Sequence, residues 1–267
     1  MWLINGEANG ALSPLDRGLA YGDGVFRTLK VSHHEPIWWK DHYFKLAHDC
    51  AALRLACPEA DLLLNEIGIV TASCNDAVIK IILTRGPGAR GYAPPDPASP
   101  TRIVMATPLP EAHDIKAGIQ VRWCSLRLAR QAQLAGIKHL NRLENVLARQ
   151  EWTDPNITEG LLCDDTGAVI GGTRSNLFVM RNGRLWTPDL SFSGITGVTR
   201  ARILRAAKLR GIEIQVGRLE TANILDADEV FLSNSIVGLW RIAGLDNVQW
   251  RSAEWTEQFQ QWIYETD

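Results

Sequence analysis

The chain of 267 residues lacks several features that would assign it to a broad class. It has no uninterrupted apolar run near the 18 residues that a membrane-spanning helix needs, so we expect no membrane partner. It has no basic excess, since 28 Lys and Arg face 30 Asp and Glu, and nucleic acid is therefore not an expected partner. The first residues have neither the basic region nor the apolar region of a secretory signal, which favours a cytoplasmic location.

Cysteine is also scarce and unpatterned. The chain has five cysteines, an odd number, with no C-x-x-C pair, which favours free thiols in a reducing cytosol over a disulfide framework. The six histidines show no H-x-x-x-H or H-E-x-x-H spacing, so we predict no metal site. At 46% hydrophobic residues the composition is that of a globular protein, long enough for one large or two medium domains.

What is present is a mixture of strand and helix patterns without regular βαβ alternation. This mixture predicts an α+β (mixed α/β) fold with two domains. We place an N-terminal α/β domain at residues 1–110, a linker at 111–118 and a C-terminal domain at 119–267. Strands are predicted at 25–31, 77–84, 102–107, 119–126, 160–163, 168–170, 177–186, 213–216 and 229–232. Helices are predicted at 41–55, 59–72, 141–152, 199–209 and 253–264.

A glycine-rich loop follows the strand predicted at 77–84. Gly86–Gly91 matches G-x-G-x-x-G, but a dinucleotide site needs a helix next, and three prolines within 94–97 forbid one. We therefore reject a dinucleotide site. Two arginines remain in the loop, Arg85 and Arg90, either as solvated charges or as guanidinium groups offered to a substrate carboxylate.

Two further segments have the residue types of an anion site. Gly194–Arg200 leads into an apolar-periodic helix, and Gly197 and Thr199 suit a helix start that either caps itself or binds an anion. Ser233–Ser235 places hydroxyl and amide groups at the end of a predicted strand, where ligand contacts often occur.

Lys138 stands just ahead of a predicted helix, after a short apolar, glycine-containing approach. Most lysines are solvated surface charges, but a lysine held in a cleft has a lowered pKa and can act as an amine nucleophile. A lysine, a loop arginine and a helix-start anion site together are what pyridoxal phosphate chemistry requires.

Five segments, in chain order, carry a resemblance to a known family: Asp16–Phe26, Thr84–Tyr92, Gly136–Leu143, Arg174–Phe178 and Gly194–Arg200. Together they resemble the class IV fold of pyridoxal phosphate enzymes. The resemblance implies a small N-terminal α/β domain, a larger barrel-like C-terminal domain and a homodimer. Within this family, the segments around Lys138 and Arg90 are most similar to the 4-amino-4-deoxychorismate lyases, which form 4-aminobenzoate and pyruvate on the way to folate.

The resemblance also implies roles for individual residues. Lys138 matches the Schiff-base lysine and Thr28 matches a proton donor to the leaving enolpyruvate, so these two are the expected catalytic residues. The expected substrate-binding residues are Arg90 and Tyr92. The expected contacts to pyridoxal 5'-phosphate, besides Lys138, are Lys45, Val198, Thr199, Asn234 and Ser235.

Two positions depart from the family pattern. Lys45 stands where arginine is usual, which replaces a bidentate phosphate contact by a single point charge. Gly171 stands where a glutamate usually pairs with the pyridine nitrogen, and its absence makes the cofactor a poorer electron sink. We read Gly171 as favouring a lyase over an aminotransferase of D- or branched-chain amino acids, although it also fits a non-catalytic or re-purposed member of the fold.

Overall fold

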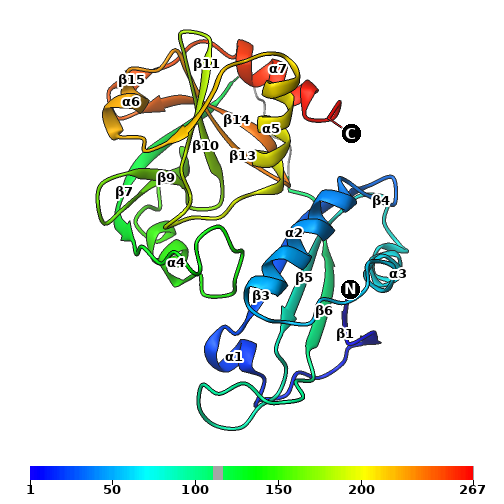
Figure 1. Ribbon diagram of the computed structural model, residues 1–267. Coiled ribbons are helices and arrows are strands. Elements are labelled where there is room, and N and C mark those ends of the chain that lie inside the picture. Colours follow the sequence, from blue (N-terminus) through cyan, green and yellow to red (C-terminus); the bar gives the residue numbers. More distant parts are fainter. Residues whose placement is uncertain (111–116, 267) are drawn as a thin grey trace. The chain divides into compact units, whose positions relative to one another are not determined.

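The structure is a computed structural model that describes residues 1–110 and 117–266 (Figure 1). Most of the predicted linker, residues 111–116, lies outside the described residues. The chain divides into two compact units, one of Met1–Glu111 with Ile137–Asn141 and one of Ala112–Gly136 with Arg142–Asp267. The short segment that carries Lys138 thus belongs to the first unit, although the chain on either side of it belongs to the second.

The first unit is built on a six-stranded antiparallel sheet in the order β2-β1-β6-β5-β3-β4. Its strands are β1 (Trp2–Ile4), β2 (Glu7–Ala8), β3 (Gly24–Ser32), β4 (Glu35–Pro36), β5 (Ala77–Thr84) and β6 (Thr101–Thr107). Its helices are α1 (Arg17–Tyr21), α2 (Trp39–Ala52) and α3 (Ala60–Thr71).

Helices α2 and α3 pack on one face of this sheet. Leu46 of α2 and Ile67 of α3 join the apolar side chains of β3, β5 and β6 in one buried cluster. Because side chains alternate along a strand, β3 turns Val25, Arg27 and Leu29 toward the helices, while Phe26 and Thr28 lie half-buried on the opposite face. The face of β3 away from the helices is therefore the one that can present functional groups.

The second unit is built on a nine-stranded mixed sheet that curls into a half-barrel, in the order β12-β11-β10-β13-β14-β7-β8-β9, with β15 paired to β14. Its strands are β7 (Ile119–Leu128), β8 (Ile157–Asp164), β9 (Val169–Gly172), β10 (Asn176–Arg181), β11 (Arg184–Pro188), β12 (Ile214–Gly217), β13 (Glu229–Asn234), β14 (Gly238–Leu245) and β15 (Val248–Gln249). Its helices are α4 (Leu143–Arg149), α5 (Val198–Leu209), α6 (Thr221–Leu225) and α7 (Glu254–Trp262).

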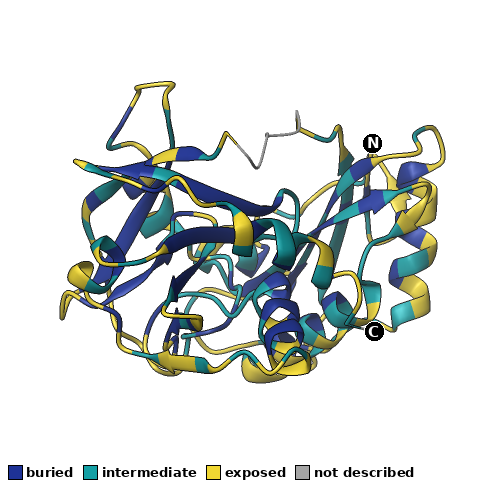
Figure 2. Cartoon of the chain, turned by 90° about the horizontal axis from the view of Figure 1, so that it is seen from above, coloured by how far each residue is buried: buried dark blue, intermediate teal, exposed yellow. Residues whose placement is uncertain are grey.

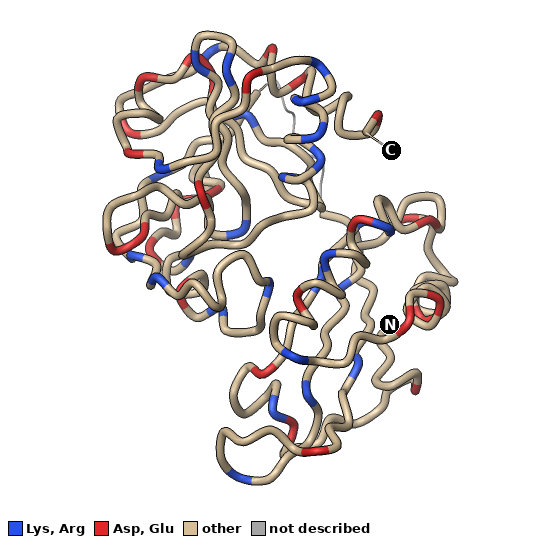
Figure 3. The backbone as a smooth tube through the Cα atoms, in the orientation of Figure 1, with Lys and Arg blue, Asp and Glu red and all other residues tan. Residues whose placement is uncertain are grey.

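Helices α5 and α7 pack against this sheet at β13 and β14 (Figure 1). Phe231 of β13 links α7 to the sheet, since its ring stacks on Phe178 of β10 at 5.1 Å between centroids and meets Phe259 of α7 at 5.7 Å. Figure 2 shows buried residues running along the strands of the sheets, and Figure 3 shows both charge signs distributed along each unit.

The mixed strand-and-helix prediction is confirmed. The strand predicted at 77–84 is β5, and the predicted hairpin turn at Asn182 and Gly183 has the two positive φ values, 50° and 72°, that a type I′ turn needs. The helix predicted at 141–152 is shorter, Leu143–Arg149. Among the described residues, no helix has the length and apolarity that a bilayer crossing requires.

Candidate active site

Lys138 is held against the start of β3 by backbone hydrogen bonds. The Phe26 N–H donates to the Lys138 carbonyl at 3.0 Å, and the Leu140 N–H donates to the Gly24 carbonyl at 3.0 Å. An antiparallel bridge joins Val25 to His139 between them. The segment Ile137–Asn141 therefore behaves as a short extra strand, which fixes the backbone of Lys138 within the first unit.

The half-buried face of β3 and β5 gathers an aromatic ring, a hydroxyl and two amines. The Lys138 ammonium lies 4.4 Å from the centre of the Phe26 ring, and the Lys80 ammonium lies 5.3 Å from the same ring. Thr28 follows Phe26 on this face of β3 and is paired with Lys80 in the strand register. Lys80 was not among the predicted site residues, although its place between Val78 and Ile82 in an alternating strand could have signalled it.

Asp49, in α2, is a fully buried carboxylate beside these groups. Its Oδ2 accepts a hydrogen bond from the Lys138 backbone N–H at 3.0 Å and forms an ion pair with Arg27 of β3. Its Oδ1 pairs with the Lys45 ammonium one helical turn earlier. Neither Asp49 nor Arg27 was predicted, because an aspartate in an amphipathic helix and an arginine in a strand usually face water.

The cations around Asp49 are strongly perturbed by their surroundings. Burial, with the positive charges of Arg27 and Lys138, lowers the pKa of Lys45 to about 7. Burial also lowers the pKa of Arg27 to about 9. An anion placed near Lys45 would reverse this effect, because it would stabilise the charged ammonium that burial disfavours. The predicted cofactor residue Lys45 thus lies in an electropositive, partly buried setting.

The glycine-rich loop carries the predicted residues Arg90 and Tyr92. No helix follows Gly91, as the prolines at 94, 95 and 97 predict. The Arg90 side chain is exposed, and it pairs with no carboxylate among the described residues. Tyr92 is 86% exposed, with its ring 5.4 Å from that of Tyr21.

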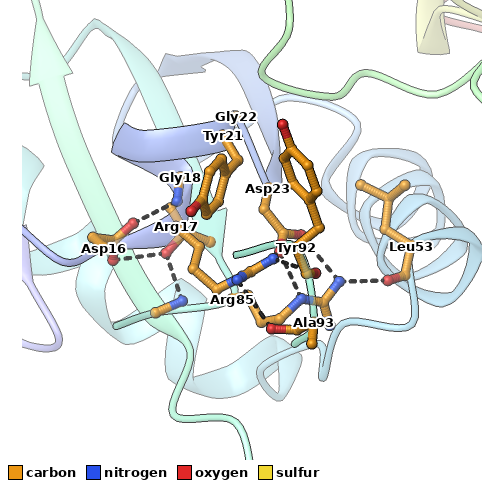
Figure 4. A network of polar contacts seen from close by, with 12 residues as sticks. Asp16, Arg17, Gly18, Tyr21, Gly22, Asp23, Leu53, Arg85, Tyr92 and Ala93 are labelled. Carbon is orange, nitrogen blue, oxygen red and sulfur yellow. Dashed lines mark hydrogen bonds and ion pairs between the residues drawn. The ribbon is translucent and has the colours of Figure 1, made fainter. Parts of the chain in front are cut away.

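Arg85, unlike Arg90, forms hydrogen bonds and an ion pair with other residues of the first unit (Figure 4). Its guanidinium donates to both carboxylate oxygens of Asp23, at 2.8 and 3.0 Å, and to the Leu53 and Arg54 carbonyls. Burial acts to raise the pKa of Asp23, but the hydrogen bonds and charges of Arg85 and Arg17 hold that pKa below its ordinary value. Arg85 and Arg90 therefore do not form a joint fork for a substrate.

The other predicted cofactor residues lie in the second unit, at the start of α5. Val198 is the first residue of this helix, and its N-cap, Gly197, offers no side-chain cap. Thr199 is buried, and its hydroxyl lies 3.3 Å from that of Ser235. The Asn234 side-chain oxygen accepts from two backbone N–H groups of the following turn, so this residue shapes the turn. Thr199 and Ser235 are thus brought together, as an anion site at a helix start requires.

Gly171 is buried in β9, and its surroundings leave no room for a side chain. A Cβ built on Gly171 would lie 2.8 Å from the Ser175 carbonyl oxygen. The buried carboxylate of Glu159, in β8, is used to hold the adjacent turn, since it accepts from the Thr173 and Ser175 hydroxyls. Among the described residues, no group of three His, Cys, Asp or Glu side chains could hold a metal ion.

Comparisons with known proteins agree on one family. The model of the amino-transferase class IV family matches residues 24–245. An aminodeoxychorismate lyase from Vibrio harveyi is 32% identical over 248 residues, which cover 92% of this chain and 91% of the relative. The crystal structure of 4-amino-4-deoxychorismate lyase from Pseudomonas aeruginosa has 40% identity and a TM-score of 0.93, over 99% of this chain and 98% of that one. Escherichia coli branched-chain amino acid aminotransferase has 25% identity and a TM-score of 0.84, over 99% and 93%.

Proposed function

Because the chain belongs to the class IV aminotransferase family, we propose that it is a pyridoxal phosphate-dependent lyase that converts 4-amino-4-deoxychorismate to 4-aminobenzoate and pyruvate. The observation that carries this proposal is the likeness to lyases of that name, which extends over nearly the full length of both chains. Lys138 supports the proposal, because its backbone is fixed by hydrogen bonds and its ammonium lies over the Phe26 ring.

Each unit supplies groups of the kind that the phosphorylated cofactor needs. In the first unit, the Lys138 amine would bind its carbonyl carbon. In the second unit, the Thr199 and Ser235 hydroxyls at the start of α5 would suit its phosphate. Lys45, in the first unit, would add positive charge. Because burial lowers the pKa of Lys45, a bound anion would raise that pKa again and favour the charged ammonium. When bound, pyridoxal phosphate supplies an electron sink for a carbon that loses a proton.

The residues of the first unit supply the remaining steps. Lys138 Nζ, freed by the substrate's amine, removes the proton from the amine-bearing ring carbon as a general base. Thr28, on the same strand face as Phe26, gives a proton to the enolpyruvyl oxygen as the carbon–oxygen bond breaks. The exposed guanidinium of Arg90 binds a substrate carboxylate, and Tyr92 lines its approach.

An aminotransferase is the second candidate, since the likeness to the Escherichia coli branched-chain enzyme also covers nearly all of the chain. Gly171 argues against it. Amino transfer depends on strong charge delocalisation into the cofactor ring, whereas an elimination that yields an aromatic product has its own driving force. The absence of a carboxylate at position 171 therefore costs a lyase less.

Incubation with 4-amino-4-deoxychorismate separates the two candidates. We expect 4-aminobenzoate and pyruvate without an added keto acid, whereas amino-group transfer to a keto acid without such release would reject the lyase. Borohydride reduction and peptide mass analysis should find a pyridoxyl group on Lys138, and none in Lys138→Ala. The variant Lys208→Ala, which changes an exposed lysine of α5, is the matched control. A wild-type protein without the adduct would leave only the non-catalytic alternative.

We further propose a cytoplasmic homodimer. The five free cysteines suit a reducing compartment. Helix α4 exposes an apolar stripe, with Leu143, Val146 and Leu147 at 75%, 50% and 55% exposure, which a second copy of the chain could cover. Analytical ultracentrifugation should give the mass of a dimer, and Val146→Glu should shift it toward the monomer.

A further inference from the structure

Asp49 binds four groups from three segments of the first unit. Its Oδ2 receives the Lys138 backbone N–H and the Arg27 guanidinium. Its Oδ1 receives the Lys45 ammonium and lies 3.3 Å from His48 Nδ1. A buried carboxylate is costly unless it is paired and hydrogen-bonded, and Asp49 uses both oxygens for this. One side chain thus ties α2 to β3 and to the segment that carries Lys138.

Several positive charges lie around Asp49. Arg27, Lys45 and Lys138 place three positive charges near one carboxylate when both lysines are protonated. Burial and the charges of Lys45 and Arg27 lower the pKa of His48, which disfavours a further positive charge there. A phosphate monoester carries charge of the opposite sign, and an anion bound near these amines would favour their charged forms.

We propose that Asp49 is the positioning residue for Lys138, fixing its backbone through one oxygen and setting, through its charge, the protonation of the amines beside it. This inference rests on the proposed function, because it concerns how the Schiff-base lysine is prepared for its role. Lys45 and Lys138 are both drawn into the site by the same carboxylate, one through its ammonium and the other through its backbone.

The sign of the effect follows from charge. Removal of the Asp49 carboxylate takes away the negative charge that stabilises the protonated nitrogens of Lys45 and Lys138, so their pKa values fall. Removal of the Lys45 ammonium takes away a positive charge that opposes protonation of Lys138, so its pKa rises. Asp49→Asn and Lys45→Met should therefore shift the same titration in opposite directions.

The test uses the full-length protein loaded with pyridoxal phosphate. The visible absorbance of the bound cofactor is titrated with pH, which reports protonation of the nitrogen of Lys138. In Asp49→Asn the midpoint should fall by at least about one pH unit, the effect of a unit charge about 12 Å away at an effective dielectric constant of about 20. Glu66→Gln is the matched control, because Glu66 is a buried carboxylate of α3 paired with Arg102 at 2.6 Å and does not touch Lys138.

A second measurement needs no cofactor. In the unloaded protein, Asp49→Ala removes the acceptor of the Lys138 N–H, so exchange of this amide with deuterium should accelerate about tenfold or more. Exchange at this amide should stay unchanged in Glu66→Gln. If Asp49 contributed only to stability, Asp49→Ala would accelerate exchange throughout the sheet and not selectively at the Lys138 amide.

The outcomes separate this inference from the proposed function. If the wild-type protein forms no pyridoxyl adduct at Lys138, the proposed function fails. If the adduct forms but the midpoint of Asp49→Asn stays within 0.2 units of wild type, or Glu66→Gln shifts it equally, Asp49 has no positioning role. If Asp49→Asn does not fold, Lys45→Met is titrated in its place. An absorbance midpoint in Lys45→Met that does not rise above the wild-type midpoint overturns the proposal.

Discussion

A glutamate at Gly171 is the residue that the family resemblance implies there, and we predict that its introduction destabilises the protein without creating an ion pair to the cofactor's pyridine nitrogen. The strand at this position is shaped around the missing side chain. A Cβ at Gly171 would lie 2.8 Å from the Ser175 carbonyl oxygen, closer than carbon and oxygen normally approach without a bond. The obstacle is backbone, so no side-chain rotation can relieve it, and β9 or the turn at 172–175 must move.

The size of the effect follows from two contributions. Overpacking that forces a backbone shift costs about 1–3 kcal/mol. A carboxylate introduced at a buried position adds a desolvation cost, and the buried carboxylate of Glu159 lies beside the neighbouring Gly172. We therefore expect Gly171→Glu to lower the free energy of unfolding by about 3 kcal/mol, equivalent to a fall of about 6–12 °C in melting temperature for a domain of this size.

Thermal melting followed by circular dichroism measures this effect. Gly171→Ala isolates the Cβ, and it should show a smaller fall of about 1–2 kcal/mol. Gly217→Glu is the control, because a Cβ at this strand position in β12 meets nothing within 4 Å, so its melting temperature should stay within about 2 °C of wild type. A melting temperature of Gly171→Glu equal to that of the wild type would refute this prediction. Faster amino-group transfer in Gly171→Glu than in the wild type would refute it further.

Two further predictions concern the first unit. Thr28→Val should lower kcat of the lyase reaction about 100-fold with an unchanged melting temperature, whereas Thr28→Ser should keep most of the activity. Steady-state kinetics measure both variants. Full activity in Thr28→Val would show that Thr28 has no part in the mechanism. Because the folded-state pKa of Asp23 lies below 3.8, its pairing adds stability above about pH 4 that is lost as the pH falls further. In Arg85→Gln the loss of melting temperature between pH 6 and pH 3 should therefore be smaller than in wild type, and an equal loss would contradict the role given to Arg85.

Local sequence patterns predicted the elements whose signals lie within a few residues. The strand β5 alternates along its length, and the hairpin at Asn182 and Gly183 has the residues its turn requires. The strand β14 escaped prediction because Arg241 interrupts its apolar run. In the structure the guanidinium of Arg241 is buried and donates to the Trp250 and Ala117 carbonyls, partners that only the folded chain brings near.

In the candidate site, too, some residues could be predicted from the local sequence and others could not. Lys138 and Thr199 lie in short motifs whose residue types indicate a functional site, so the sequence pointed to them. Asp49 and Arg27 carry no such signal, because an aspartate in an amphipathic helix and an arginine in a strand normally face water. Their burial becomes intelligible only when α2, β3 and the segment Ile137–Asn141 are placed together, since each charge is then stabilised by the other.

The preference for a lyase rests on more than an amino-acid difference at position 171. If Gly171 only replaced a glutamate in an unchanged strand, a single substitution could restore strong amino transfer. The Ser175 carbonyl occupies the space that the first side-chain atom would need, so the neighbouring turn is built for glycine as well. Glu159 holds that turn through Thr173 and Ser175 and is not available to take the glutamate's place. We therefore infer that a weak electron sink would be set by the fold at this point, and a reaction driven by aromatisation of its product is the one that would tolerate it.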